Sequence, residues 1–392
     1  MRKRLNSEIG RIKLEEYKYL KLKAELLVDG VCASPNALRD LGRKYKEQNH
    51  GLFGWDFEDH VGILLPDDFA LPDGTLVQFR NNSRSPYQVI VEGDDLVLLN
   101  GKENICKIEW IPRPIYYDLE TSNHNRMVKI GQIGGEDCLF FCYQNYCSHF
   151  SKGEECLFCN LVSTSETYDS VLKKKDVEDI GKVAKAAFSE GMVKHVLLTG
   201  GCINREKEIE LVSKIMKSIQ QHTGFDRIPG TILPSPAKGE DEIKRYYDTG
   251  IQAIGFSMEI WDKKLYEVIC PGKAKSTNHE TFVHSIRDAV RIFGAGNVYG
   301  VFVMGLETKD TFLDGVKELT ELGANVVPFV WSPNPGSKLE GHRAPTGKWF
   351  VETILEASDI VRAGNIPSGD ENHCYKCDGN SLLHDALRIT AK

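Results

Sequence analysis

The chain has 392 residues, of which 41% are hydrophobic and 27% charged, enough apolar surface for one large domain or for one with a smaller companion. Its net charge of −7 argues against nucleic-acid binding as its main role, because neutralising phosphates requires clustered Lys and Arg. The basic N-terminus lacks the apolar core and cleavage site of a signal peptide, and no segment approaches the roughly 18 apolar residues that a membrane span needs. We therefore expect a cytoplasmic protein that binds neither nucleic acid nor membrane. The sequence makes no prediction of its oligomeric state.

Residues 1–120 have a different pattern of predicted elements from the rest of the chain and are expected to form an N-terminal α+β accessory domain. An amphipathic helix at the start gives way to short runs with strand character, separated by turn residues such as Pro72, Asp73 and Gly74. The strands are predicted at residues 61–65, 76–79, 87–91, 96–99 and 105–110. Prolines on either side of Arg113 predict a hinge at residues 111–114, because they favour extended backbone.

From about residue 136 the sequence alternates strand and helix patterns. Strands are predicted at residues 139–143, 195–198, 230–233, 253–258, 298–304 and 326–331. Helices are predicted at residues 177–188, 206–221, 240–247, 282–293, 311–322 and 349–362. Six such units with short connections imply a parallel sheet covered by helices, which we interpret as a partial (β/α)6 TIM-like barrel over residues 121–366. A doubly wound sheet is the competing arrangement, but its glycine-rich first turn is absent. Residues 367–392 are expected to be a C-terminal extension.

The cysteines carry the clearest chemical signal. Eleven cysteines in a reducing compartment indicate metal binding or catalysis before disulfides. Cys147, Cys156 and Cys159 lie in one stretch after the first barrel strand, with no fourth cysteine close behind. Three thiolates can hold a [4Fe–4S] cluster and leave one iron open, whereas structural metal sites use four closed ligands and electron-transfer clusters usually use four cysteines. Cys142 is an alternative first ligand in place of Cys147. Cys32, Cys106 and Cys270 stand alone and are interpreted as small core residues.

At these positions the chain resembles the radical S-adenosylmethionine (radical SAM) superfamily, with a core similar to biotin synthase. The family carries three cysteines in the loop after the first barrel strand, with an aromatic residue, here Phe158, just before the third. The commonest family spacing has three residues between the first two cysteines, whereas this chain has eight. The resemblance extends over residues 136–340 and does not assign a subgroup.

The resemblance implies a set of residues that bind S-adenosylmethionine. Thr199, Gly200 and Gly201 match the glycine motif after the second strand, although Cys202 stands where the family often has an acidic residue. Glu206 or Glu208 could replace that acid. The fourth and fifth strand regions supply the remaining matches: Ser257, Glu259, Val303, Gly305 and Glu307.

The resemblance also implies the reaction. The open iron would chelate S-adenosylmethionine, and one electron from a donor such as flavodoxin or ferredoxin would cleave it reductively. The resulting 5′-deoxyadenosyl radical would abstract hydrogen from a small metabolite or cofactor precursor, for sulfur insertion, rearrangement or methyl transfer. Five residues are candidates to face that substrate at the barrel mouth: Tyr143, Asn334, Lys338, His342 and Arg343.

Cys374 and Cys377 form a CxxC pair near the C-terminus. They are candidates for an auxiliary metal site, either a second cluster or zinc, with a redox or structural pair as the alternative. Two other classes of protein therefore stay open at this point. One is a non-catalytic iron–sulfur electron-transfer protein. The other is a zinc-stabilised binding module that uses Cys156 and Cys159 together with the C-terminal pair.

Overall fold

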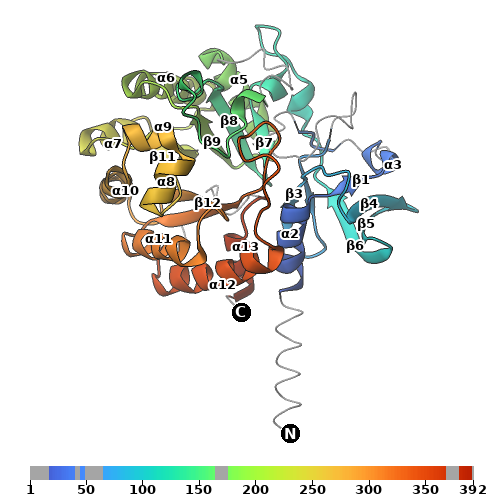
Figure 1. Ribbon diagram of the computed structural model, residues 1–392. Coiled ribbons are helices and arrows are strands. Elements are labelled where there is room, and N and C mark those ends of the chain that lie inside the picture. The colour runs from blue at the N-terminus through green and yellow to red at the C-terminus, as the bar shows by residue number, and fades with distance from the viewer. Residues whose placement is uncertain (1–16, 40–44, 49–64, 164–174, 368–378, 391–392) are drawn as a thin grey trace.

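The computed structural model describes residues 17–39, 45–48, 65–163, 175–367 and 379–390 (Figure 1). It contains a large curled sheet covered by helices and a smaller sheet at the N-terminal side. The predicted strand at 61–65, the start of the N-terminal helix and the CxxC pair lie partly or wholly outside these ranges. In the described part of the chain, no helix has both the length and the apolar character needed to cross a bilayer.

The large sheet has the strand order β13-β12-β11-β10-β9-β8-β7. Neighbours from β8 to β13 pair in parallel, and β7 pairs antiparallel with β8 at one edge. The strands are β7 (Gln132–Gly134), β8 (Cys138–Gln144), β9 (His195–Gly200), β10 (Ile228–Ile232), β11 (Ile251–Glu259), β12 (Val298–Met304) and β13 (Asn325–Val330). The six predicted barrel strands and the partial (β/α)6 barrel are confirmed.

Helices follow the parallel strands and cover the outer face of the sheet (Figure 1). They are α5 (Val177–Ser189), α6 (Arg205–Thr223), α7 (Glu240–Tyr247), α8 (Lys263–Ile269), α9 (Pro271–Ser276), α10 (His279–Phe293), α11 (Lys309–Glu321) and α12 (Gly347–Ala363). Six of them begin at a side chain that accepts a hydrogen bond from the first turn, as N-cap residues do. These caps are Asp176, Asn204, Asp262, Asn278, Thr308 and Thr346. The short α8 and α9 were not predicted.

The two faces of the sheet bury different side chains, because successive residues of a strand point to opposite faces. On β8, Leu139 and Phe141 belong to the main core beneath the helices. Ala253, Tyr299, Val301 and Val327 form a separate cluster from neighbouring strands. This inner cluster lies beside the cavity described below.

The N-terminal sheet has the order β1-β4-β5-β6-β2-β3. Its strands are β1 (Cys32–Ala33), β2 (Asp68–Ala70), β3 (Leu76–Gln78), β4 (Tyr87–Glu92), β5 (Asp95–Asn100) and β6 (Glu103–Trp110), and it carries α2 (Lys18–Asp29) and α3 (Pro35–Leu38). Four of its predicted strands are confirmed, and β1 and β2 were not predicted. Among the described residues, 3₁₀ turns in the connections are η2 (Ile115–Asp118), η3 (Met127–Lys129) and η4 (Phe150–Lys152). A C-terminal helix, α13 (Leu383–Thr390), packs on α12.

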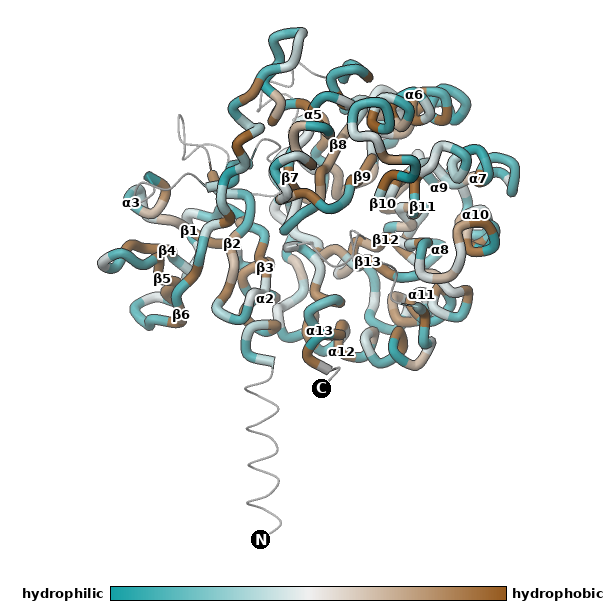
Figure 2. The backbone as a smooth tube through the Cα atoms, turned by 180° about the vertical axis from the view of Figure 1, so that it is seen from behind, coloured by the Kyte–Doolittle hydropathy of each residue, from teal (hydrophilic) through white to brown (hydrophobic). Residues whose placement is uncertain are grey.

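The open side of the curled sheet, between β13 and β7, faces β2 and β3 of the N-terminal sheet (Figure 2). Hydrogen bonds connect the two sheets at this open side, through the segment at residues 379–380 and through Lys46. The amide of Val330 on β13 donates to Asn380, and the amide of Gln78 on β3 donates to Gly379. Lys46 donates hydrogen bonds to Asp68 at the start of β2 and to the carbonyl of Gly135, the residue after β7. The N-terminal region therefore forms the missing wall of the barrel.

The main apolar core continues through this wall, from Leu20 to Ala386. The division into an accessory domain, a barrel and a C-terminal extension accordingly stays a proposal about evolutionary or folding units. In the structure, the described parts of these three regions share one apolar core.

Candidate functional site

The loop after β8 brings the three predicted cysteines to the carboxyl edge of the sheet. The backbone amide of Cys159 donates to the carbonyl of Cys156 at 3.0 Å, which turns the chain tightly between these two residues. Burial, followed by the nearby sulfur atoms of Cys156 and Cys147, raises the pKa of the Cys159 thiol to about 12. The pKa of Cys159 therefore responds to both other loop cysteines, although the three thiols are not among the groups whose ligand atoms all lie within 4.8 Å of one another.

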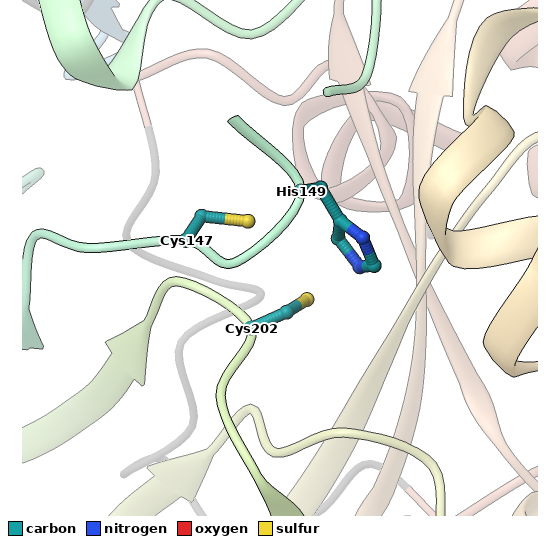
Figure 3. A group of neighbouring side chains, drawn as sticks. All are labelled: Cys147, His149 and Cys202. Atoms are coloured by element: carbon teal, nitrogen blue, oxygen red, sulfur yellow. The ribbon is translucent and has the colours of Figure 1, made fainter. Parts of the chain in front are cut away.

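Cys147 lies against a thiol that comes from another element. Ligand atoms of Cys147, His149 and Cys202 all lie within 4.8 Å of one another, and their side chains point toward a common space (Figure 3). The Cys202 thiol donates a hydrogen bond to Cys147 and holds its pKa well below the ordinary value, with help from the amides of His149 and Cys202. Cys147 is thus poised as a thiolate, the form that binds metal.

Two neighbouring segments hold the cysteine loop in place. The amide of Ser148 donates to the carbonyl of Cys202 at 2.9 Å, and a Cβ at Gly201 would lie 2.2 Å from the carbonyl oxygen of Tyr146. On the other side, the amide of Leu157 donates to Ile269 at 2.8 Å, and a Cβ at Gly272 would lie 2.3 Å from the His149 ring. Both glycines are therefore required for the loop to approach so closely.

Cys270 contacts the cysteine loop, which the sequence did not predict. It is fully buried, as predicted for a core cysteine, but its thiol also hydrogen-bonds Cys156. Each of two loop cysteines is thus paired with a thiol from outside the loop. The motif Cys270-Pro-Gly-Lys273 was a signal for this contact, although its partner in the cysteine loop could not be read from the sequence.

A cavity of about 340 Å³ opens beside this loop at the strand edge, and we call it the edge cavity. Its lining includes Gly200, Cys202, Glu208, Ser257 and Lys273. The Glu208 carboxylate is buried and accepts hydrogen bonds from the Ser235 amide at 3.0 Å and from the hydroxyls of Tyr143 and Tyr246 at 3.3 Å. Burial nevertheless raises the pKa of Glu208.

A second cavity, of about 330 Å³, lies inside the curled sheet, and we call it the barrel cavity. Phe158 from the cysteine loop, Thr199, Glu259 and Val303 line one part of it. Leu233 lines both cavities. Their walls are also joined by an ion pair, since Lys273 of the edge cavity bonds Glu259 of the barrel cavity at 2.5 Å.

The ion pair is built into a distorted strand end. Glu259 has φ of +67° next to an irregularity in the pairing of β11 with β12, and such a backbone is uncommon for a residue other than glycine. Burial alone would lower the pKa of Lys273, yet Glu259 and then the thiols of Cys156, Cys202 and Cys270 hold it well above its ordinary value. A permanent cation therefore lies among the thiols.

Comparison with known proteins agrees with this geometry. The model of the radical SAM superfamily matches residues 142–319, from the end of β8 into α11. Residues 142–319 therefore form a radical SAM domain.

Among its relatives is the bacteriochlorophyllide c C-7(1)-hydroxylase of Chlorobaculum limnaeum, 23% identical over 296 residues, 71% of this chain and 73% of the relative. The biotin synthase of Nautilia profundicola is 24% identical over 237 residues, 59% of this chain and 83% of the relative. Among solved structures, the hydrogenase maturase HydG of Carboxydothermus hydrogenoformans is 16% identical with a TM-score of 0.45. That match covers 58% of this chain and 51% of HydG.

As a radical SAM enzyme, the protein uses a [4Fe–4S] cluster and S-adenosylmethionine. The residues of the chain fit these groups. Three thiols of one loop supply a three-cysteine donor set, Cys147 is poised as a thiolate, and Lys273 offsets negative charge beside them.

The structure distributes the residues expected to bind S-adenosylmethionine over the two cavities and two further places. Gly200 and Ser257 line the edge cavity, and Gly201 lies under the cysteine loop. Phe158, Thr199, Glu259 and Val303 line the barrel cavity. Gly305 and Glu307 line neither of these cavities. Gly305 has φ of +108° and backs onto Phe350, and the Glu307 carboxylate accepts hydrogen bonds from the amides of Trp261 and Asp262.

The two alternatives for the missing acidic residue are separated in space. Glu208 lies buried in the edge cavity, whereas Glu206 is exposed and pairs with Arg245. Cys142, the alternative first ligand, makes its contacts near the end of β8. Its thiol contacts the carbonyl of Gln144 at 3.6 Å, and its carbonyl accepts from Lys175.

The remaining candidates differ in their surroundings. Asn334 lines the barrel cavity, but the Tyr143 hydroxyl donates to Glu208. Lys338 pairs with Glu155 at 2.9 Å, and His342 and Arg343 are exposed. Cys374 and Cys377 lie outside the described residues, so an auxiliary metal site there stays a prediction.

Proposed function

We propose that this protein reductively cleaves S-adenosylmethionine at a [4Fe–4S] cluster held by Cys147, Cys156 and Cys159, and removes hydrogen from a small metabolite or cofactor precursor. The observation that carries the proposal is that the cysteine loop after β8 lines two adjoining cavities, the edge cavity through Ser148 and His149 and the barrel cavity through Phe158. Active sites of barrel enzymes lie at the carboxyl edge of the barrel strands. When bound, the cluster and S-adenosylmethionine supply the radical that attacks an unactivated C–H bond.

The residues of the chain bind and orient the ligands and keep water away from them. In the edge cavity, Glu208 suits the ammonium of a bound amino acid moiety and Lys273 suits its carboxylate, since each is a buried or partly buried opposite charge. The backbone at Gly200 and Gly201 can approach a ligand closely because no side chain stands in the way. In the barrel cavity, apolar side chains such as Val301 and Phe329 exclude water from the reacting carbon.

The proposal includes a cytoplasmic location and reduction by a flavodoxin or ferredoxin, as the superfamily resemblance implies. It leaves the reaction that follows hydrogen removal open. The relatives are a hydroxylase and a biotin synthase by name, and these names describe different reactions.

Anaerobic reconstitution tests the proposal. The wild-type protein should take up about four irons and four sulfides per cluster and show an electron paramagnetic resonance signal that S-adenosylmethionine perturbs. After reduction by dithionite it should release 5′-deoxyadenosine. A reconstituted cluster that never yields 5′-deoxyadenosine would contradict the catalytic proposal and favour an electron-transfer role.

Two cysteine variants test the ligand assignment. Cys147→Ala should lower bound iron to about a tenth of the wild-type amount or less, because a three-cysteine site cannot lose a ligand. Cys142→Ala, on the same strand end, should keep its iron and its signal. The reverse result would assign Cys142 as the first ligand.

A further inference from the structure

The barrel cavity has an apolar part and a polar part that come from different regions of the chain. Its apolar lining comes from the barrel strands and includes Phe140, Leu197, Val301 and Phe329. The polar part lies where the N-terminal sheet closes the barrel. It is lined by Asp67, Asp68 and Gln78 around β2 and β3, by Gln132 on β7, and by Asn380. We call these five residues the polar wall.

Polar atoms of this cavity are buried without partners among the described residues. They are Oε1 of Gln78, Oε1 of Gln132 and Nε1 of Trp331. Gln132 is only 8% exposed and Trp331 6%, so their surroundings offer little water. A buried polar group left unpaired costs about 1–3 kcal/mol. The two glutamine oxygens are acceptors, so a ligand with hydrogen-bond donors would complete them, whereas the Trp331 N–H is itself a donor and is not completed by such a group.

The charges of the polar wall favour a ligand that donates hydrogen bonds. Lys46 is fully buried and bonds Asp68 at 2.6 Å, Asp67 at 3.3 Å and the Gly135 carbonyl at 2.7 Å. One ammonium thus serves two carboxylates, and Asp67 is the more distant and the more exposed of the two. Arg80, the nearby cation, gives its donors to the carbonyl oxygens of Leu27, Val330 and Asn380.

The opposite part of the cavity adjoins the cysteine loop. Phe158 comes from the cysteine loop itself, and Glu259 pairs with the lysine that lies among the thiols. A ligand anchored at Asp67 would therefore extend its apolar part along the inner strand residues toward the cysteine loop. A volume of about 330 Å³ suits a small molecule.

We propose that the barrel cavity binds a small apolar amine, with its N–H groups held by Asp67, Gln78 and Gln132 and its hydrocarbon part directed toward Phe158. The role of this amine as the substrate that loses hydrogen depends on the proposed function. Its binding does not.

Calorimetric titration of the reconstituted protein with three matched probes tests the proposal at pH 8. The probes share a phenylpropyl body and differ at one end: 3-phenylpropylamine, 3-phenylpropan-1-ol and 3-phenylpropionate. The amine should bind at least about tenfold more tightly than the carboxylate, with the alcohol between them, because Asp67 attracts a cation and repels an anion.

Variants locate the binding. Asp67→Asn should weaken the amine about tenfold and weaken the alcohol less, and Gln132→Met should weaken both. Asp94→Asn, in the exposed turn between β4 and β5, is the matched control and should bind as the wild type does. No detectable binding of the amine, equal affinities for amine and carboxylate, or undiminished amine binding by Asp67→Asn would overturn the proposal.

The two proposals fail separately. If the wild type releases 5′-deoxyadenosine but shows no preference for the amine, only the amine proposal is wrong. If the amine binds as expected and no 5′-deoxyadenosine forms, the catalytic proposal is wrong while the binding site stands.

Discussion

Asp67 has a partly buried carboxyl group whose titration influences stability as well as binding. Burial and the neighbouring Asp68 raise the pKa of Asp67 from its ordinary value of 3.8 to about 7. Between these two pH values the folded protein keeps a proton on Asp67 that the unfolded chain has released. The free energy of unfolding therefore falls as pH rises from about 4 to about 7 through this group.

Asp67→Asn removes this titration, so we expect a smaller loss of thermal stability between pH 5 and pH 8 than in the wild type. Melting temperatures of the two proteins at both pH values measure it, and a difference of a few degrees is expected. Asp94→Asn should follow the wild type. An equal loss in Asp67→Asn and wild type would show that other groups set the pH dependence.

Cys202 shows how a residue that departs from the family pattern finds a different partner. It follows the glycine pair where the family often has an acidic residue, and here its thiol hydrogen-bonds Cys147. The acidic side chain of the edge cavity comes instead from Glu208, on the first turns of α6. The sequence alone did not distinguish Glu206 from Glu208. In the structure the two side chains lie on different faces of α6, so that only Glu208 lines the edge cavity.

At the scale of elements, the loops after neighbouring strands hold one another. The loop after β8 is bonded to the segment after β9 and to the α8–α9 region. The loop after β11 is fixed by Glu307, which follows β12 and accepts from the amides of Trp261 and Asp262 at 2.9 Å and 3.0 Å. This contact stabilises the strand end that carries Glu259.

Glu307→Ala should therefore lower stability, because two amides near the protein interior lose their acceptor. Each loss costs about 1–3 kcal/mol, and we expect a fall in melting temperature of several degrees. Glu307→Gln keeps one acceptor oxygen and should lie in between. Glu318→Ala, on the exposed face of α11, is the control. If Glu307→Ala is as stable as this control, the contact of Glu307 with the amides of Trp261 and Asp262 does not stabilise the strand end.

The barrel strands were predictable because their apolar runs and following caps are local signals. The edges of β12, for example, are set by Val298 and Met304 in both prediction and structure. By contrast, β7 and β2 have three residues each, too few for a periodic pattern. The cysteine motif was equally local, but the Cys270 contact and the polar wall depend on pairing between distant segments. Asp67 and Gln132 line the same cavity only because the N-terminal sheet closes the barrel, which the sequence pattern does not show.

For the whole molecule, that closure depends on Arg80, which lies on the N-terminal side and reaches the barrel. Its side chain is fully buried, and its guanidinium donates to Leu27 on α2 at 2.5 Å, to Val330 on β13 at 2.7 Å and to Asn380 at 2.5 Å. It thus ties together three segments far apart in sequence. Two of its three partners, Val330 and Asn380, also line the barrel cavity.

Arg80→Met keeps an unbranched side chain but removes every donor, leaving three buried oxygens without this partner. Hydrogen bonds to charged groups contribute about 1.5–3 kcal/mol each, so we expect a lower melting temperature and faster amide hydrogen exchange in β3 and β13, on the two sides of the closure. Arg84→Met changes an exposed arginine four residues away and should alter neither measurement. If exchange rises uniformly over the barrel instead of at these two strands, Arg80 stabilises the fold as a whole. If neither measurement changes, the N-terminal wall is held by its apolar contacts alone.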